Sequence, residues 1–108
     1  MLSIQQYRPV FSLLAVCFLS AACSEKPNVG EQIVNTVCVV CHSQAINGAP
    51  IIGNKKMWSK RLPQGEEVLI QHAIEGYELM PAKGGKTEIT DEEVAAAVRY
   101  MVQQVSNE

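Results

Sequence analysis

Residues 38–42 read CVVCH. The fold of the chain depends on which kind of site these five residues form. Cys38 and Cys41 are three positions apart, and His42 follows the second cysteine directly. Cysteines at this spacing occur in redox disulfides, in half of a zinc-binding knuckle, and at the attachment site of a covalent haem. The remainder of the chain has to discriminate among these three kinds of site.

The N-terminus has the pattern of an export signal. Arg8 precedes the apolar run 10–22, VFSLLAVCFLSAA, which ends in small residues. A transmembrane helix needs about 20 apolar residues, so this shorter run favours a signal peptide, with an uncleaved membrane anchor as the alternative. We therefore predict a signal peptide over residues 1–22 and a mature protein in the periplasm.

Cys23 stands where such a signal would be cut. The stretch LSAAC, residues 19–23, resembles a bacterial lipoprotein signal, although its leucine lies one place further from the cysteine than is usual. The resemblance implies that Cys23 is the first mature residue and carries a lipid anchor to a membrane. Ordinary cleavage after Ala22 is the alternative. Residues 23–28, CSEKPN, are polar and contain Pro27, which predicts a short tether.

The cysteine count favours haem. Cys17 would leave with the signal peptide and Cys23 would be terminal. Only Cys38 and Cys41 then remain, with no second pair for a zinc knuckle and no strand–helix–strand pattern for a thioredoxin-type disulfide. A mature chain of about 85 residues buries a modest core, which a large apolar cofactor would complete.

Apolar residues at helical spacing predict an all-α domain without strands. The expected helices run from an Asn28 N-cap into the CVVCH motif, over residues 54–62 up to Pro63, over Glu66–Glu75 up to a left-handed Gly76, and onward from a Thr90–Glu93 capping box. The last helix has the clearest buried stripe, made of Val94, Ala97, Val98, Met101 and Val105.

The motif suits a covalent haem c. Two thiols on one helical turn can each form a thioether with a vinyl group of the porphyrin, so Cys38 and Cys41 would fix the ring. His42 would then lie under the ring centre as the proximal iron ligand. Its other nitrogen needs an acceptor, and Pro50 could present a carbonyl oxygen, unless this proline only shapes a turn.

A second axial ligand is predicted at Met80. This methionine lies in the irregular segment 77–89, from which a loop can place its thioether over an open haem face. His72 is the runner-up. Met57 and Met101 are expected to pack in the protein interior, Met101 within the stripe of the last helix.

Four segments together resemble a known family: CVVCH, NGAPIIG, MPAKGG and TDEEVAAAVRYM. They are similar to class I cytochromes c, and more narrowly to the bacterial cytochrome c-five subgroup, over nearly all of the chain after the tether. The resemblance implies a small class I cytochrome c fold in residues 29–106, with crossing N- and C-terminal helices and a covalent haem in the core. Gly30 and Tyr100 match the places where those two helices meet.

The same resemblance implies the roles of the site residues. They are Cys38 and Cys41 for haem attachment, His42 and Met80 for iron ligation, and Pro50 as the hydrogen-bond acceptor of the histidine. The chain departs from the subgroup after Gly84–Gly85, where many members have a second cysteine pair that forms a disulfide. Lys86 and Ile89 stand in those places, so the loop lacks this covalent cross-link.

Two protein ligands would leave no open position on the iron. This ligation and the resemblance imply a single-electron carrier with one low-spin haem c, not an enzyme, that shuttles electrons between respiratory redox partners. The alternative is a haem c sensor or enzyme in which Met80 is displaced by an external ligand. We expect protein redox partners, a monomer, and no nucleic acid.

Basic side chains gather in two segments of a chain whose net charge is −2. They are Lys55, Lys56, Lys60 and Arg61 in the first segment, and Lys83 and Lys86 just after Met80. In the class I fold both segments lie near the exposed haem edge or the propionates, so they would steer an acidic partner, with a merely solvated surface as the alternative. Trp58 and Arg61 are the candidates for binding the propionates.

Overall fold

The computed structural model describes residues 27–107. The predicted signal peptide, Cys23 and most of the predicted tether lie outside this range. The elements in chain order are α1 Val29–Ile33, η1 Val34–Cys38, α2 Val39–His42, η2 Ile46–Gly48, α3 Lys55–Trp58, η3 Leu62–Gln64, α4 Glu66–Glu75, η4 Ala82–Gly85 and α5 Asp91–Ser106. The described residues are helical apart from turns and one isolated bridge, Tyr77 to Met80, which confirms the all-α prediction.

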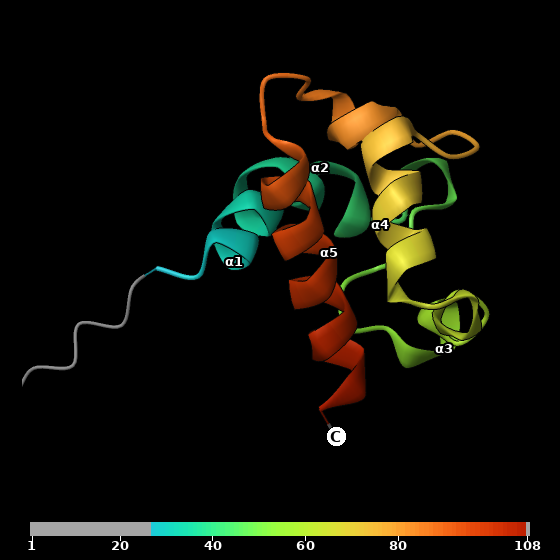
Figure 1. Ribbon diagram of the computed structural model, residues 1–108. Coiled ribbons are helices and arrows are strands. Elements are labelled where there is room, and N and C mark those ends of the chain that lie inside the picture. The colour runs from blue at the N-terminus through green and yellow to red at the C-terminus, as the bar shows by residue number, and fades with distance from the viewer. Residues whose placement is uncertain (1–26, 108) are drawn as a thin grey trace, which may run out of the picture.

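The first helical stretch runs without a break from α1 through η1 into α2 (Figure 1). It begins at Asn28, whose side chain accepts a hydrogen bond from the backbone N–H of Glu31 at 3.3 Å, as an N-cap residue does. The middle portion η1 is a π-helical turn, which is wider than an α turn and is often found at functional sites. The π-helical turn ends at Cys38, so its geometry determines how the CVVCH side chains are oriented.

The first and last helices cross in direct contact. Gly30 is buried against α5, and a β-carbon at this position would collide with the carbonyl oxygen of Ala96. Beside the crossing, the Tyr100 hydroxyl donates a hydrogen bond to the Glu31 carboxylate at 3.2 Å. The predicted crossing of the terminal helices is therefore confirmed, with glycine required for the close approach.

Helix α5 lies between α1 on one side and α4 on the other (Figure 1). Its N-terminus forms the predicted capping box, because Thr90 Oγ1 accepts from Glu93 N–H at 3.2 Å and Glu93 Oε2 accepts from Thr90 N–H at 2.8 Å. Its predicted apolar stripe is buried in full, at Val94, Ala97, Val98, Met101 and Val105. No helix in the described part of the chain is long and apolar enough to cross a membrane.

Two local predictions need correction. The helix expected over residues 54–62 ends at Trp58, and Pro63 lies inside η3 because its fixed φ suits the first turn of a short 3₁₀ helix. Helix α4 has the predicted bounds. Gly76 was expected in the left-handed helical conformation. Its φ of 88° is positive as expected, but its ψ of 150° is extended, so the chain turns away from α4 in a different conformation.

Candidate functional site

A central pocket opens between α2, α4, α5 and the loops that follow α2 and α4. Apolar side chains of these elements make up much of its wall. All seven predicted site residues line it: Cys38, Cys41, His42, Pro50, Trp58, Arg61 and Met80. Residues far apart in the sequence are thus brought to one cavity, which has two thiols and one imidazole on a single wall.

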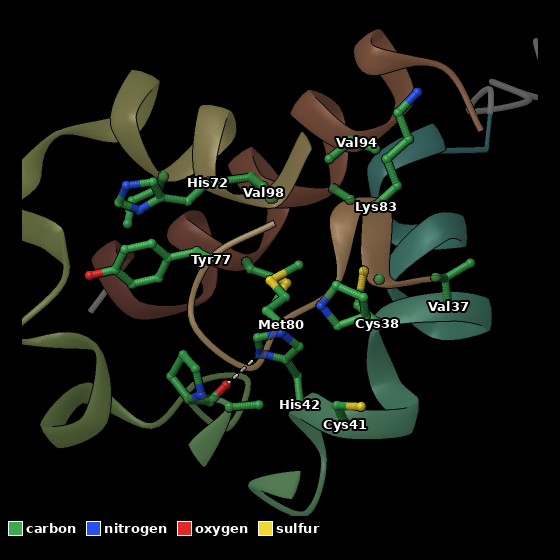
Figure 2. A pocket seen from close by; sticks show the side chains of 18 of the residues that line it. Val37, Cys38, Cys41, His42, His72, Tyr77, Met80, Lys83, Val94 and Val98 are labelled. Carbon is green, nitrogen blue, oxygen red and sulfur yellow. Dashed lines mark hydrogen bonds between the residues drawn. The ribbon is translucent and has the colours of Figure 1, made fainter. Parts of the chain in front are cut away.

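His42 is held in one orientation on that wall. Its side chain is buried, and its Nδ1–H donates a hydrogen bond to the carbonyl oxygen of Pro50 at 2.8 Å, drawn as the dashed line in Figure 2. Burial lowers the pKa of His42, and the positive charge of Arg61 lowers this pKa further, against the opposing effect of the Pro50 hydrogen bond. The imidazole therefore stays neutral and keeps Nε2 for a metal, as a proximal iron ligand must.

Cys38 and Cys41 are partly buried and are not joined to each other. Burial raises the pKa of the Cys38 thiol to about 11, so this thiol is protonated at neutral pH. Both side chains come from the η1–α2 stretch beside His42 (Figure 2). Residues 27–107 contain no cluster of three or more His, Cys, Asp or Glu side chains placed to share a metal ion, as a zinc knuckle would require.

Met80 approaches the pocket from the loop after α4. Its side chain extends toward the imidazole of His42 in Figure 2. Its backbone pairs with Tyr77 through two hydrogen bonds, of 3.0 Å and 2.9 Å. Among the other ligand candidates, Met57 does not line the pocket, and Met101 is a core residue that is 4% exposed.

His72, the remaining candidate, also lines the pocket, but its ring contacts another side chain. Its ring stacks on the ring of Tyr77, with the centroids 3.9 Å apart and the planes at 8°. The sequence interpretation missed this contact, because residues five apart across the end of a helix have no regular neighbour relation. Only the turn after Gly76 brings the two rings together.

Trp58 and Arg61 line the pocket with their donors directed at backbone oxygens. The Trp58 indole N–H donates to the Ile51 carbonyl at 2.9 Å. Arg61 donates from Nη1 to the Met57 carbonyl at 2.6 Å and from Nη2 to the Gly48 carbonyl at 3.4 Å. These contacts fasten the loop after α2 to α3, and propionate binding by the two residues stays a prediction.

Lys83 has a structural partner that the sequence interpretation did not foresee. Its ammonium group donates to the Ile89 carbonyl at 2.8 Å and forms an ion pair with Asp91 at 2.8 Å, and its side chain is 20% exposed. These two contacts of the ammonium group join η4 to the start of α5. Lys83 therefore has a structural role in the fold, and its steering of a partner stays a prediction. Lys86 forms only a long, exposed ion pair with Glu88, at 3.6 Å.

Residues 25–101 match the family model described as cytochrome C oxidase, cbb3-type, subunit III. Relatives include cytochrome c-555 of Prosthecochloris aestuarii, 40% identical over 70% of this chain and 85% of its own length. Cytochrome c5 of Ectopseudomonas mendocina is 32% identical over 66% of this chain and 84% of its own. The chain belongs to the class I cytochromes c. The c5 relative bears the name of the predicted subgroup.

Solved structures of cytochromes c share the fold of this cytochrome. One is the cytochrome c in a crystal structure of an electron transfer complex with nitrite reductase, with a TM-score of 0.68 and 35% identity over 74% of this chain and 96% of that one. Another is reduced cytochrome c551 of Ectothiorhodospira halophila, with a TM-score of 0.58 and 28% identity over 69% of this chain and 97% of that one.

The central pocket of this cytochrome fits the cofactor of the family. Its apolar wall suits a porphyrin, and the two thiols with the adjacent neutral imidazole supply the donor set that covalent haem requires. The protein carries one haem c, attached covalently through Cys38 and Cys41. It is a small electron-carrier haem protein.

Proposed function

We propose that this cytochrome is a periplasmic single-electron carrier whose haem iron is ligated by His42 and Met80. The observation that carries the proposal is the placement of these two side chains in one pocket, one from helix α2 and the other from the loop after α4. The buried imidazole is fixed by Pro50, and the thioether reaches toward it.

The chemistry of the two ligands suits electron transfer. The haem, when bound, supplies one reversible electron. The soft thioether of Met80 favours the ferrous state and gives a high potential, whereas the hydrogen bond from His42 to Pro50 fixes the other ligand. Because His42 and Met80 would both ligate the iron, they would leave no position for a substrate, so a carrier is favoured over an enzyme.

Replacing Met80 with alanine tests the ligation. We expect haem to stay attached, because the two cysteines are unchanged, while the reduction potential falls and carbon monoxide binds the ferrous protein. Met57→Ala is the matched control, because Met57 does not line the pocket and this variant should keep the wild-type spectrum and potential.

An unchanged spectrum and potential in Met80→Ala would show that Met80 is not an iron ligand, and His72 would become the candidate for that role. Wild-type protein that binds carbon monoxide readily would instead favour the alternative function, a haem c sensor or enzyme in which Met80 is displaced. Absorption spectra of the ferrous protein with and without carbon monoxide separate these outcomes.

The proposed partners are respiratory redox proteins that dock at the mouth of the pocket. Support comes from the structural neighbour that was crystallised in an electron transfer complex with nitrite reductase. Apolar side chains at the pocket edge are well exposed, among them Val40 at 63% and Leu79 at 68%. Such exposed apolar side chains beside a cofactor suit short-lived protein contacts. The carrier is proposed to act as a monomer.

The proposed location is the periplasm, with a lipid on Cys23 as the membrane anchor. Support comes from the apolar run 10–22 and the LSAAC sequence that ends in this cysteine. Cys23→Ala should move the protein from the membrane fraction to the soluble periplasmic fraction, because the multiple acyl chains of a bacterial lipoprotein give stable anchoring. Wild-type protein that is wholly soluble, with an unmodified first residue by mass spectrometry, would contradict the anchor.

A further inference from the structure

The rings of His72 and Tyr77 form a close parallel stack at the edge of the haem pocket. Their centroids are 3.9 Å apart and their planes differ by 8°, and Figure 2 shows the pair beside Met80. His72 belongs to the last turns of α4, whereas Tyr77 belongs to the loop that follows. The stack, referred to as the aromatic clamp, therefore joins a rigid helix to the loop that carries Met80.

The loop transmits the position of Tyr77 to Met80. Tyr77 N–H donates to the Met80 carbonyl at 3.0 Å, and Met80 N–H donates back to the Tyr77 carbonyl at 2.9 Å. Between them Glu78 has a φ of 51°, which is uncommon for a residue other than glycine. The turn is thus a small closed unit, and if Tyr77 moves, the backbone of Met80 moves with it.

The turn has little other support on its outer side. Leu79 is 68% exposed and Tyr77 is 46% exposed, so the loop gains little from burial there. Gly76 is tightly placed, since a β-carbon on it would lie 3.0 Å from the backbone nitrogen of Ala82. The aromatic clamp is therefore a side-chain contact that holds the outer side of this turn against α4, in addition to the packing of Met80 on the core cluster that contains Ile70 and Ala73.

We propose that the aromatic clamp is a positioning device that keeps Met80 on the iron. The proposal rests on Met80 being the axial ligand, as proposed above. His72 and Tyr77 do not touch the reacting atoms in this scheme. They hold the turn against α4, so that the thioether seldom leaves the iron and seldom yields the position to an external ligand.

The test measures how often Met80 leaves the ferric iron in the intact holoprotein. At saturating cyanide the binding rate is limited by dissociation of the thioether. His72→Leu and Tyr77→Leu each remove one ring, and an aromatic pair of this kind is expected to slow dissociation about 2- to 10-fold. Both leucine variants should therefore bind cyanide faster by about that factor.

Two conservative variants separate stacking from other roles. Tyr77→Phe and His72→Phe keep a ring at each position, and both should stay within about 2-fold of the wild-type rate. The double variant His72→Leu/Tyr77→Leu should be about as fast as the faster single variant, because the two rings act as one contact. Leucine variants at the wild-type rate, or phenylalanine variants as fast as the leucine ones, would overturn the clamp.

A spectroscopic readout distinguishes failure of the clamp from failure of the ligation. Ferric haem with a thioether ligand has a weak red absorption band, which wild-type protein should show and Met80→Ala should lose. If wild type lacks the band, the ligation fails and the clamp fails with it. If wild type has the band and the leucine variants bind cyanide at the wild-type rate, only the clamp is wrong. His72→Phe with an intact band also excludes His72 as the ligand.

Discussion

The two walls of the haem pocket are built in opposite ways. The histidine wall, residues 38–50, has both thiols and the imidazole within five consecutive residues, and a single hydrogen bond to Pro50 orients His42. The methionine wall, residues 76–89, contributes one proposed ligand from a loop in which Glu78 and Lys83 both have positive φ. One wall carries all its haem-binding groups in one short run of sequence, and the other depends on side-chain contacts with the helices on either side of it.

The difference shows where each wall obtains its stability. Covalent attachment and a continuous helix hold the histidine wall. Each wall holds two residues other than glycine with positive φ, Ala45 and Asn47 in the histidine wall and Glu78 and Lys83 in the methionine wall. Such conformations persist only when surrounding contacts over-determine them, and in the methionine wall these contacts have to come from side chains. Those contacts are the His72–Tyr77 clamp on α4 and the pairing of Lys83 with Asp91 at the start of α5.

The largest effect is expected on the histidine wall. Cys38→Ala together with Cys41→Ala should abolish covalent haem completely, and the small domain should lose most of its helical structure because the cofactor completes its core. Haem staining after denaturing electrophoresis and far-ultraviolet circular dichroism measure the two outcomes. Cys23→Ala is the control that should keep its haem. A well-folded double variant without haem would show that the domain does not depend on its cofactor.

An intermediate effect is expected on the methionine wall. Lys83→Met keeps the apolar stem but removes the ammonium group from Ile89 and Asp91, and the free energy of unfolding should fall by about 1–2 kcal/mol. Lys86→Met is the matched control, because its long, exposed ion pair should contribute no more than about 0.5 kcal/mol. Denaturant titration of the holoproteins measures both values. Equal losses in the two variants would mean that Lys83 does not brace the loop.

The smallest effect is expected outside both walls, on the α3 side. Lys55, Lys56 and Lys60 are exposed, unlike Lys83. Reversing all three to glutamate should leave the spectrum unchanged and slow association with an acidic redox partner about 10-fold at low salt, with the gap narrowing as salt rises. Stopped-flow electron transfer at several ionic strengths measures this. A rate at low salt equal to that of wild type would identify these lysines as ordinary surface.

The same contrast explains what the sequence could predict. The spacing of Cys38, Cys41 and His42 is visible directly in the sequence. The capping box and apolar stripe of α5 are patterns of residues a few positions apart, and the fold contains both. The bounds of α4 also follow from local pattern. These features depend on interactions between residues a few positions apart, where periodicity and capping are informative.

The remaining features depend on contacts across turns, where residues have no regular neighbour relation. No local pattern indicates a positive φ at Glu78 or the stacking of His72 on Tyr77. Lys83 resembled a free surface charge in the sequence, but the fold brings its ammonium group to Ile89 and Asp91. The sequence does not show tertiary contacts of this kind, which is why the structural role of this loop lysine was not predicted.

The close approach of Gly30 to Ala96 also bears on the order in which the chain can fold. The ribosome releases a chain from its N-terminus, so the first helix emerges long before its partner in the last. Contacts between such distant residues form late, because a long loop has to close first. Until then Cys38, which is partly buried in the finished domain, is open to solvent. The topology thus leaves an interval before folding is complete in which both cysteines are accessible for haem attachment.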